Sequence, residues 1–234
     1  MELNELEERE KNKSSLKFRI TFFFVFFLAA VFAVFVITSV LQVNTVTQFI
    51  CSHYALPTIE KAVKIIDTDS FEQLSKTLDA SDPFYTETQQ KLLEIKRESR
   101  CEYLYTMAQK KDSLFQYIID GSDEAGGENF SEMGFAEDLS YWDKAALNAF
   151  SAGETRVGTI DRSEDYGDTI SAYAPIFSKS GSVIGLIACD IDASEIVAWI
   201  KTQVIWQLGI VIVVIAIGLA VYLNLLRLVN RSFN

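Results

Sequence analysis

The chain has 234 residues, 49% of them apolar, and its 32 acidic residues outnumber the 21 basic ones to give a formal charge of −11. This charge excludes nucleic-acid binding as the main activity, because a basic surface is needed to attract phosphates. Two uncharged apolar runs, residues 20–41 and 202–226, are each long enough to cross a bilayer core of roughly 30 Å. A purely soluble protein and a transporter with many membrane helices are therefore excluded.

Basic residues flank the two apolar runs unequally. Lysine and arginine beside a membrane helix favour the cytoplasmic side. Five of them precede the first run and two follow the second, whereas only Lys201 lies close to a membrane end on the other side. The expected order is a cytoplasmic tail, an uncleaved membrane helix, an extracytoplasmic domain, a second membrane helix and the start of a cytoplasmic linker, at residues 1–19, 20–43, 44–201, 202–226 and 227–234.

Three helical segments are predicted between the first membrane helix and the first strand. Apolar residues recur at helical spacing, and aspartates stand at positions that favour helix N-caps. The segments are residues 41–66, where Pro57 favours a kink, residues 71–78, capped by Asp69 or Ser70, and residues 83–99, capped by Asp82.

From Cys101 onward the apolar residues alternate as in strands. Alternation and turn signals predict five antiparallel strands, at residues 101–107, 114–120, 155–161, 169–177 and 183–191. An acidic loop (residues 121–140) and a short helix (residues 141–150) separate the second strand from the third, and a capping box at Asp192 and Glu195 opens the last helix. The predicted domain is α+β, with a long N-terminal helix packed on a five-stranded antiparallel sheet.

Two segments resemble a known family of sensor modules. SAYAPIFSKSGSVIGLIACDIDASEI, Ser171 to Ile196, resembles the last two strands and exit helix of a Cache domain, and CEYLYTMAQKKDSLFQYIIDGSDE, Cys101 to Glu124, is similar to the first hairpin of single-Cache domains. Cache domains are the extracellular PAS-like sensor modules of bacterial chemoreceptors, histidine kinases and diguanylate cyclases. The resemblance covers about residues 45–200 and implies a PAS-like sheet in a two-pass receptor of the inner membrane, working as a parallel homodimer.

The resemblance also implies a ligand pocket, on the sheet face opposite the long helix. In relatives that bind amino acids, an aspartate that ends the last strand holds the ligand's amine, and Asp190 occupies that position. The same relatives carry an Arg-x-Trp-Tyr element for the ligand carboxylate, whereas this sequence has LSYWDK at residues 139–144, without an arginine. We therefore expect a ligand with an amine or other cationic group rather than a di- or tricarboxylate.

Six side chains are candidate ligand contacts, and each has a competing structural role. An aspartate on a half-buried strand face needs a ligand cation, a protein partner or solvent. Tyrosine is frequent in strands for packing reasons alone, and the tryptophan could be a lid or a core anchor. The candidates are Asp190, Tyr103, Tyr105, Tyr117, Trp142 and Tyr173.

Catalysis, cofactor binding and metal binding find no support in the sequence. No nucleophile elbow, P-loop or paired-carboxylate signature occurs, the single histidine lies on the helical stalk, and the acidic loop lacks the glycine and glutamate of a calcium loop. We expect no enzyme activity, no cofactor and no metal. Cys51, Cys101 and Cys189 fit idle buried thiols, or a Cys51 bridge between two subunits across the stalk.

The sequence therefore favours a membrane-anchored sensor that binds a small molecule outside the membrane and signals to a cytoplasmic output module absent from this chain. The alternative is a non-sensing membrane anchor or assembly protein whose ectodomain binds a protein partner. A cavity lined by the tyrosines and Asp190 favours the sensor, and a collapsed pocket favours the alternative.

Overall fold

The computed structural model describes residues 2–122, 130–142, 144–163 and 167–232. The chain divides into two compact units, one of two long helices (Met1–Asn44 with Ala198–Asn234) and one containing the sheet (Thr45–Val197).

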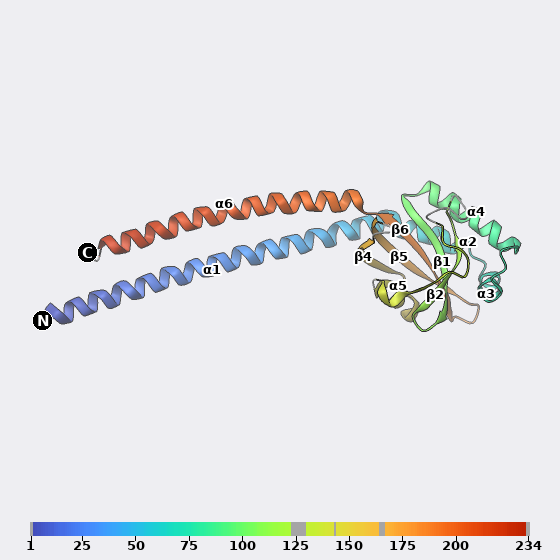
Figure 1. Ribbon diagram of the computed structural model, residues 1–234, viewed down its shortest axis with the longest axis horizontal. Coiled ribbons are helices and arrows are strands. Elements are labelled where there is room, and N and C mark those ends of the chain that lie inside the picture. Colours follow the sequence, from blue (N-terminus) through green and yellow to red (C-terminus); the bar gives the residue numbers. More distant parts are fainter. Residues whose placement is uncertain (1, 123–129, 143, 164–166, 233–234) are drawn as a thin grey trace. The chain divides into compact units, whose positions relative to one another are not determined.

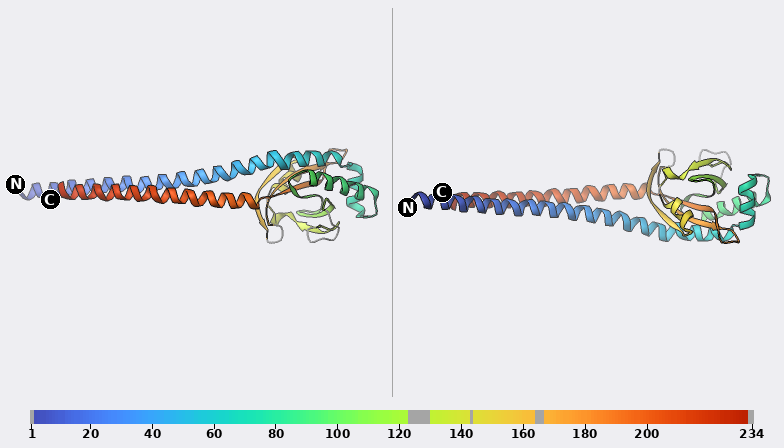
Figure 2. Two further views of the ribbon diagram at one scale, coloured as in Figure 1. Left: turned by 90° about the horizontal axis from the view of Figure 1, so that it is seen from above. Right: turned by 90° about the horizontal axis from the view of Figure 1, so that it is seen from below.

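The first unit consists of two apolar helices. Helices α1 (Glu2–Ile50) and α6 (Ser194–Ser232) run side by side in opposite directions (Figures 1 and 2). Within the unit, Phe24 stacks on Tyr222 with ring centroids 4.6 Å apart. By length and composition both helices can cross a membrane, and the most apolar window of each is not buried in protein. Such exposed apolar surface suits a lipid environment better than water.

A π-helical turn, Cys51–Ala55, lies directly before Pro57, where the sequence predicted a kink. Proline has no N–H, and its ring crowds the carbonyl four residues earlier, so regular α-helix cannot run through this point. The Leu56 N–H bonds to the Cys51 carbonyl, one residue further back than in an α-helix. Regular helix then resumes as α2 (Leu56–Ile65), with Pro57 in its first turn.

Helix α3 (Thr68–Thr77) begins earlier than the sequence predicted. Its N-cap is Asp67, whose carboxylate accepts a hydrogen bond of 2.9 Å from the Ser70 backbone N–H. The prediction of Asp69 or Ser70 as the cap is therefore wrong. Ser70 lies inside the first turn and supplies the donor that the true cap satisfies.

Within the described part of the chain the sheet has six strands rather than the predicted five. All neighbours are antiparallel, in the order β3-β2-β1-β6-β5-β4. The strands are β1 (Cys101–Lys111), β2 (Leu114–Asp120), β3 (Ala136–Asp138), β4 (Arg156–Ser163), β5 (Gly167–Phe177) and β6 (Val183–Asp192). The extra strand is β3, which lies in the segment predicted as loop and pairs with β2. The α+β class is confirmed.

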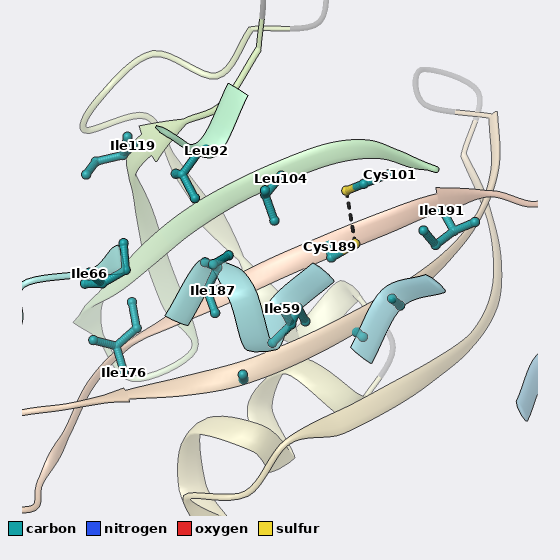
Figure 3. Packing of buried hydrophobic residues seen from close by; sticks show 14 of the residues in the cluster. Ile59, Ile66, Leu92, Cys101, Leu104, Ile119, Ile176, Ile187, Cys189 and Ile191 are labelled. Carbon is teal, nitrogen blue, oxygen red and sulfur yellow. Dashed lines mark hydrogen bonds between the residues drawn. The ribbon is translucent and has the colours of Figure 1, made fainter. Parts of the chain in front are cut away.

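Each face of the sheet carries its own core. On one face, strand residues such as Leu104 and Ile187 pack against α2, α3 and α4 (Pro83–Glu98), which Asp82 caps as predicted (Figure 3). On the other face, a smaller cluster that includes Tyr105 and Tyr173 packs against α5 (Lys144–Ala152). The helix predicted at residues 141–150 is thus a 3₁₀ turn, Leu139–Tyr141, followed by α5. We call the two sides the helix face and the pocket face.

Candidate functional site

A cavity of about 300 Å³ lies on the pocket face of the sheet. Residues of the central strands form its base, and residues between β2 and α5 enclose it. All six predicted contact residues line this cavity, namely Tyr103, Tyr105, Tyr117, Trp142, Tyr173 and Asp190. The structure therefore brings together side chains that are far apart in the sequence.

Strand register explains why the site centres on Asp190. Residues opposite one another in antiparallel strands project to the same face. Asp190 on β6 lies opposite Tyr103 of β1 on one side and Ser171 of β5 on the other. Ala188, the next residue of β6 on the same face, likewise lies between Tyr105 and Tyr173. The small alanine side chain leaves space between the two rings, beside the carboxylate.

Asp190 is only 9% exposed, and its carboxylate is hydrogen-bonded to a tyrosine. The Tyr105 hydroxyl donates a hydrogen bond to the Asp190 carboxylate. Burial, followed by the negative charge of Asp190, raises the pKa of Tyr105 well above its ordinary value. Tyr105 is therefore a protonated donor at any physiological pH, and this interaction holds the carboxylate toward the cavity.

Aromatic rings form much of the cavity wall. The ring centroids of Tyr105 and Tyr117 lie 5.1 Å apart, and those of Trp142 and Tyr173 lie 6.4 Å apart. Trp142 is half-buried and its indole N–H donates to the carboxylate of Glu137 on β3. The strand missed by the sequence analysis thus anchors the predicted lid residue.

A second buried carboxylate, that of Asp120, lines the cavity and was not predicted from the sequence. It is 4% exposed and accepts hydrogen bonds from the Ser122 N–H (2.9 Å), the Ser122 hydroxyl (2.6 Å) and the Ser131 N–H (2.7 Å). Burial raises the pKa of Asp120 although these hydrogen bonds oppose the shift. Asp120 therefore joins the end of β2 to the segment that encloses the cavity.

The position of Asp120 on the pocket face could not be predicted from the sequence, because a β-bulge precedes it. In an unbroken strand, Asp120 would share a face with Ile118, which lies in the helix-face core. The register between β1 and β2 shifts at Thr106 and Met107, so that Asp120 lies opposite Tyr105 on the pocket face. Only the Asp-Gly-Ser sequence, which favours a local aspartate-to-serine turn, marked this position.

The expectation of a pocket without arginine is wrong. Arg162 of β4 lines the cavity, and its Nε lies 3.3 Å from Oδ1 of Asp168 on β5. This arginine lies on the β4–β5 hairpin and not in the LSYWDK segment, which corresponds to the family's arginine-containing element. The described lining nevertheless stays acidic, with one guanidinium and four carboxyl groups: Asp120, Glu137, Asp161 and Asp190.

The cysteines lie away from the cavity, in the helix-face core. Cys51 is 2% exposed, so its thiol is not at the surface where a bridge between two subunits would form. The hypothesis of a Cys51 crosslink across the stalk is corrected on this ground. Among the described residues, no group of three or more histidine, cysteine or acidic side chains is placed to hold a metal ion.

No model of a known protein family and no curated protein matches the chain. Among solved structures, it is similar to the periplasmic sensory domain of the Campylobacter jejuni chemoreceptor Tlp1, with 13% identity and a TM-score of 0.40, over 68% of this chain and 59% of that chain. It is also similar to the sensor domain of the V. cholerae histidine kinase DctB, with 14% identity and a TM-score of 0.38, over 67% of this chain and 57% of that one.

A third similar structure is the ligand-binding domain of the Campylobacter jejuni chemoreceptor Tlp3 in complex with L-valine. The identity is 13% and the TM-score 0.39, over 76% of this chain and 66% of that chain. The chain thus spans less than two thirds of each of these three chains. Two of the three are domains of chemoreceptors, and one is the sensor domain of a histidine kinase.

Proposed function

We propose that this protein is a membrane-anchored sensor whose extracytoplasmic domain binds a small molecule with a cationic group beside Asp190. The observation that carries the proposal is the acidic, tyrosine-lined cavity of about 300 Å³ on the pocket face. Its volume is at the lower end of the range for small-molecule sites, roughly 300–1,000 Å³. It suits a small metabolite better than a segment of a partner protein, and so supports the sensor over the assembly protein.

The charge of the site supports a cationic ligand. The chain carries −11 in total, its N-terminal tail is neutral and its C-terminal tail carries +2, which leaves −13 between the tails. Such a field attracts cations and repels anions, and the tyrosine and tryptophan faces around the cavity also favour a cation. Arg162 at the cavity, paired with Asp168, offers a place for a single carboxylate, so a zwitterion that carries an amine is compatible with the site.

The two apolar helices support the membrane part of the proposal. Lysines and arginines in both tails favour a cytoplasmic location for the two termini, in the inner membrane of a bacterium. We propose a parallel homodimer in this membrane. Strand β6 carries Asp190 and ends at Asp192, and α6 begins at Ser194. If β6 can adopt two conformations and the ligand binds one of them more tightly, ligand binding would therefore shift the start of α6.

A thermal-shift screen of the full chain in detergent micelles tests this function. The probes are mono- and diamines, α-amino acids, and di- and tricarboxylates. A ligand present at 100 times its dissociation constant adds about 2.7 kcal/mol to the free energy of unfolding. For a domain of this size that corresponds to roughly 5–11 °C in Tm. Stabilisation by amines and not by di- or tricarboxylates supports the proposal, and stabilisation by the carboxylates alone contradicts it.

A further inference from the structure

Two buried thiols of the helix face lie within reach of one another. Sγ of Cys189 and Sγ of Cys101 are 3.0 Å apart, and the two residues are separated by 88 positions in the chain (Figure 3). Cys189 is fully buried and Cys101 is 7% exposed. A disulfide bond measures about 2.05 Å, so closing the remaining gap requires only a small movement of the two side chains.

A β-bulge creates this pair. Cys101 has the same sequence parity as Tyr103 and Tyr105, and uninterrupted alternation would place it on the pocket face. The register between β1 and β6 shifts between Cys101 and Tyr103, so that Cys101 lies opposite Ile191 in the helix-face core. Cys189, opposite Leu104, projects into the same core. The bulge therefore turns one cysteine toward the other.

We propose that Cys101 and Cys189 form an intramolecular disulfide when the domain folds in an oxidising compartment. The co-reactant is the disulfide of a thioredoxin-fold oxidant or of oxidised glutathione. The thiolate of one cysteine attacks that disulfide, forms a mixed disulfide and releases one sulfur of the oxidant as a thiol. The thiolate of the other cysteine then attacks the mixed disulfide and releases the remaining sulfur of the oxidant. The two thiols lose two protons and two electrons, one S–S bond forms, and the oxidant leaves as two thiols.

The environment of the thiols determines when the bond forms. Hydrogen bonding to Cys101 and burial raise the pKa of Cys189 well above its ordinary value. Burial alone raises the pKa of Cys51 to about 11. Because the thiolate is the reactive species, the thiols of Cys189 and Cys51 exchange slowly once the core has closed. We therefore expect the bond to form as the domain folds, and burial then protects it from exchange with Cys51.

The position of the bond gives it a structural role beside the cavity. It joins the first residue of β1 to the residue that precedes Asp190 on β6. The two strands that carry Tyr103 and Asp190 would then be tied covalently behind the pocket face. The disulfide would limit how far β6 can slide along β1 and so hold the carboxylate in register with the tyrosines.

Thiol counting on the full chain tests the pairing. The protein is purified from membranes without reductant, denatured, and alkylated with N-ethylmaleimide. We expect one adduct per chain, on Cys51, three adducts after reduction, and a linked pair of peptides that contain Cys101 and Cys189. Three adducts without reduction, a linked peptide that contains Cys51, or a link between two chains would each overturn the proposal.

A second test compares Tm with and without reductant in the wild type and in cysteine variants. A disulfide that closes a long loop raises Tm by roughly 4–16 °C in a domain of this size. Dithiothreitol should lower Tm by this amount in the wild type and in Cys51→Ala, and should have no effect in Cys101→Ala/Cys189→Ala. An equal response of the wild type and the double variant would overturn the proposal. Ligand binding is measured separately on the same preparation, so a missing disulfide and a missing ligand site are distinguishable.

Discussion

Replacing Gly185 by alanine tests the packing that supports the ligand-bearing strand. A Cβ atom at this position would lie 2.5 Å from the Met107 carbonyl oxygen and 2.6 Å from Cε1 of Phe71. Both distances are shorter than any normal contact, and the first involves backbone in the middle of the sheet. Phe71 is fully buried on α3 and cannot swing aside into solvent. Overpacking of this kind lowers the free energy of unfolding by about 1–3 kcal/mol.

Thermal unfolding of the full chain in micelles, followed by circular dichroism, measures this cost. For a domain of this size the loss corresponds to a Tm lower by roughly 2–12 °C. Gly209→Ala is the control, because a Cβ atom there meets nothing within 4 Å. A Gly185→Ala variant as stable as wild type, or Gly209→Ala destabilised to the same extent, would refute the close approach of α3 to β6.

Three further predictions concern pH, topology and the membrane helices. Burial raises the pKa of Asp120 and of Glu137, so acidification protonates both carboxyls at a higher pH than an exposed carboxyl, for which the pKa is about 4. Calorimetry should therefore show that the affinity for an amine falls as the pH is lowered from 7 toward about 4; constant or rising affinity would argue against a cation in this cavity. A reporter fused to the C-terminus should be active in the cytoplasm, and periplasmic activity would exclude the proposed topology. Gln207 bonds to Ser39 (3.0 Å) and Gln42 (2.9 Å), so Gln207→Leu should destabilise the helix pair by about 1 kcal/mol, and an unchanged Tm in micelles would contradict this.

Most of the sheet was predictable because its strands are long and rich in apolar residues, and turn residues bound several of them. Alternation over β1, β5 and β6 and the glycine-containing turns between them predicted five strands close to their observed bounds. The three residues of β3 are too few to produce an alternating pattern, and they form a strand only because β2 offers an open edge. The start of α3 was misplaced because Asp67, Asp69 and Ser70 are all good caps, and local sequence does not decide among them.

The candidate site, like the sheet, could be predicted from the sequence only in part. The six candidate residues line the cavity because five of them lie on strands and face the pocket, while Trp142 follows the 3₁₀ turn. Their role as ligand contacts stays a prediction. Asp120 and Cys101 were not assigned to the faces on which they lie, because bulges in β1 and β2 change the register locally. Arg162 was missed because its presence in the cavity depends on how the β4–β5 hairpin curls over the sheet, which no local sequence pattern encodes.

Calorimetric titration of Asp190→Asn tests the central claim most directly. The probe is the amine that gives the largest thermal shift with the full chain, and Asp112→Asn, in the exposed β1–β2 turn, is the charge-matched control. The asparagine keeps the shape of Asp190 and removes its charge, and a hydrogen bond to a charged group contributes about 1.5–3 kcal/mol. We expect the affinity of Asp190→Asn to fall by about ten- to a hundredfold while Asp112→Asn binds like wild type. Unchanged binding by Asp190→Asn would contradict a cation-binding site at this carboxylate.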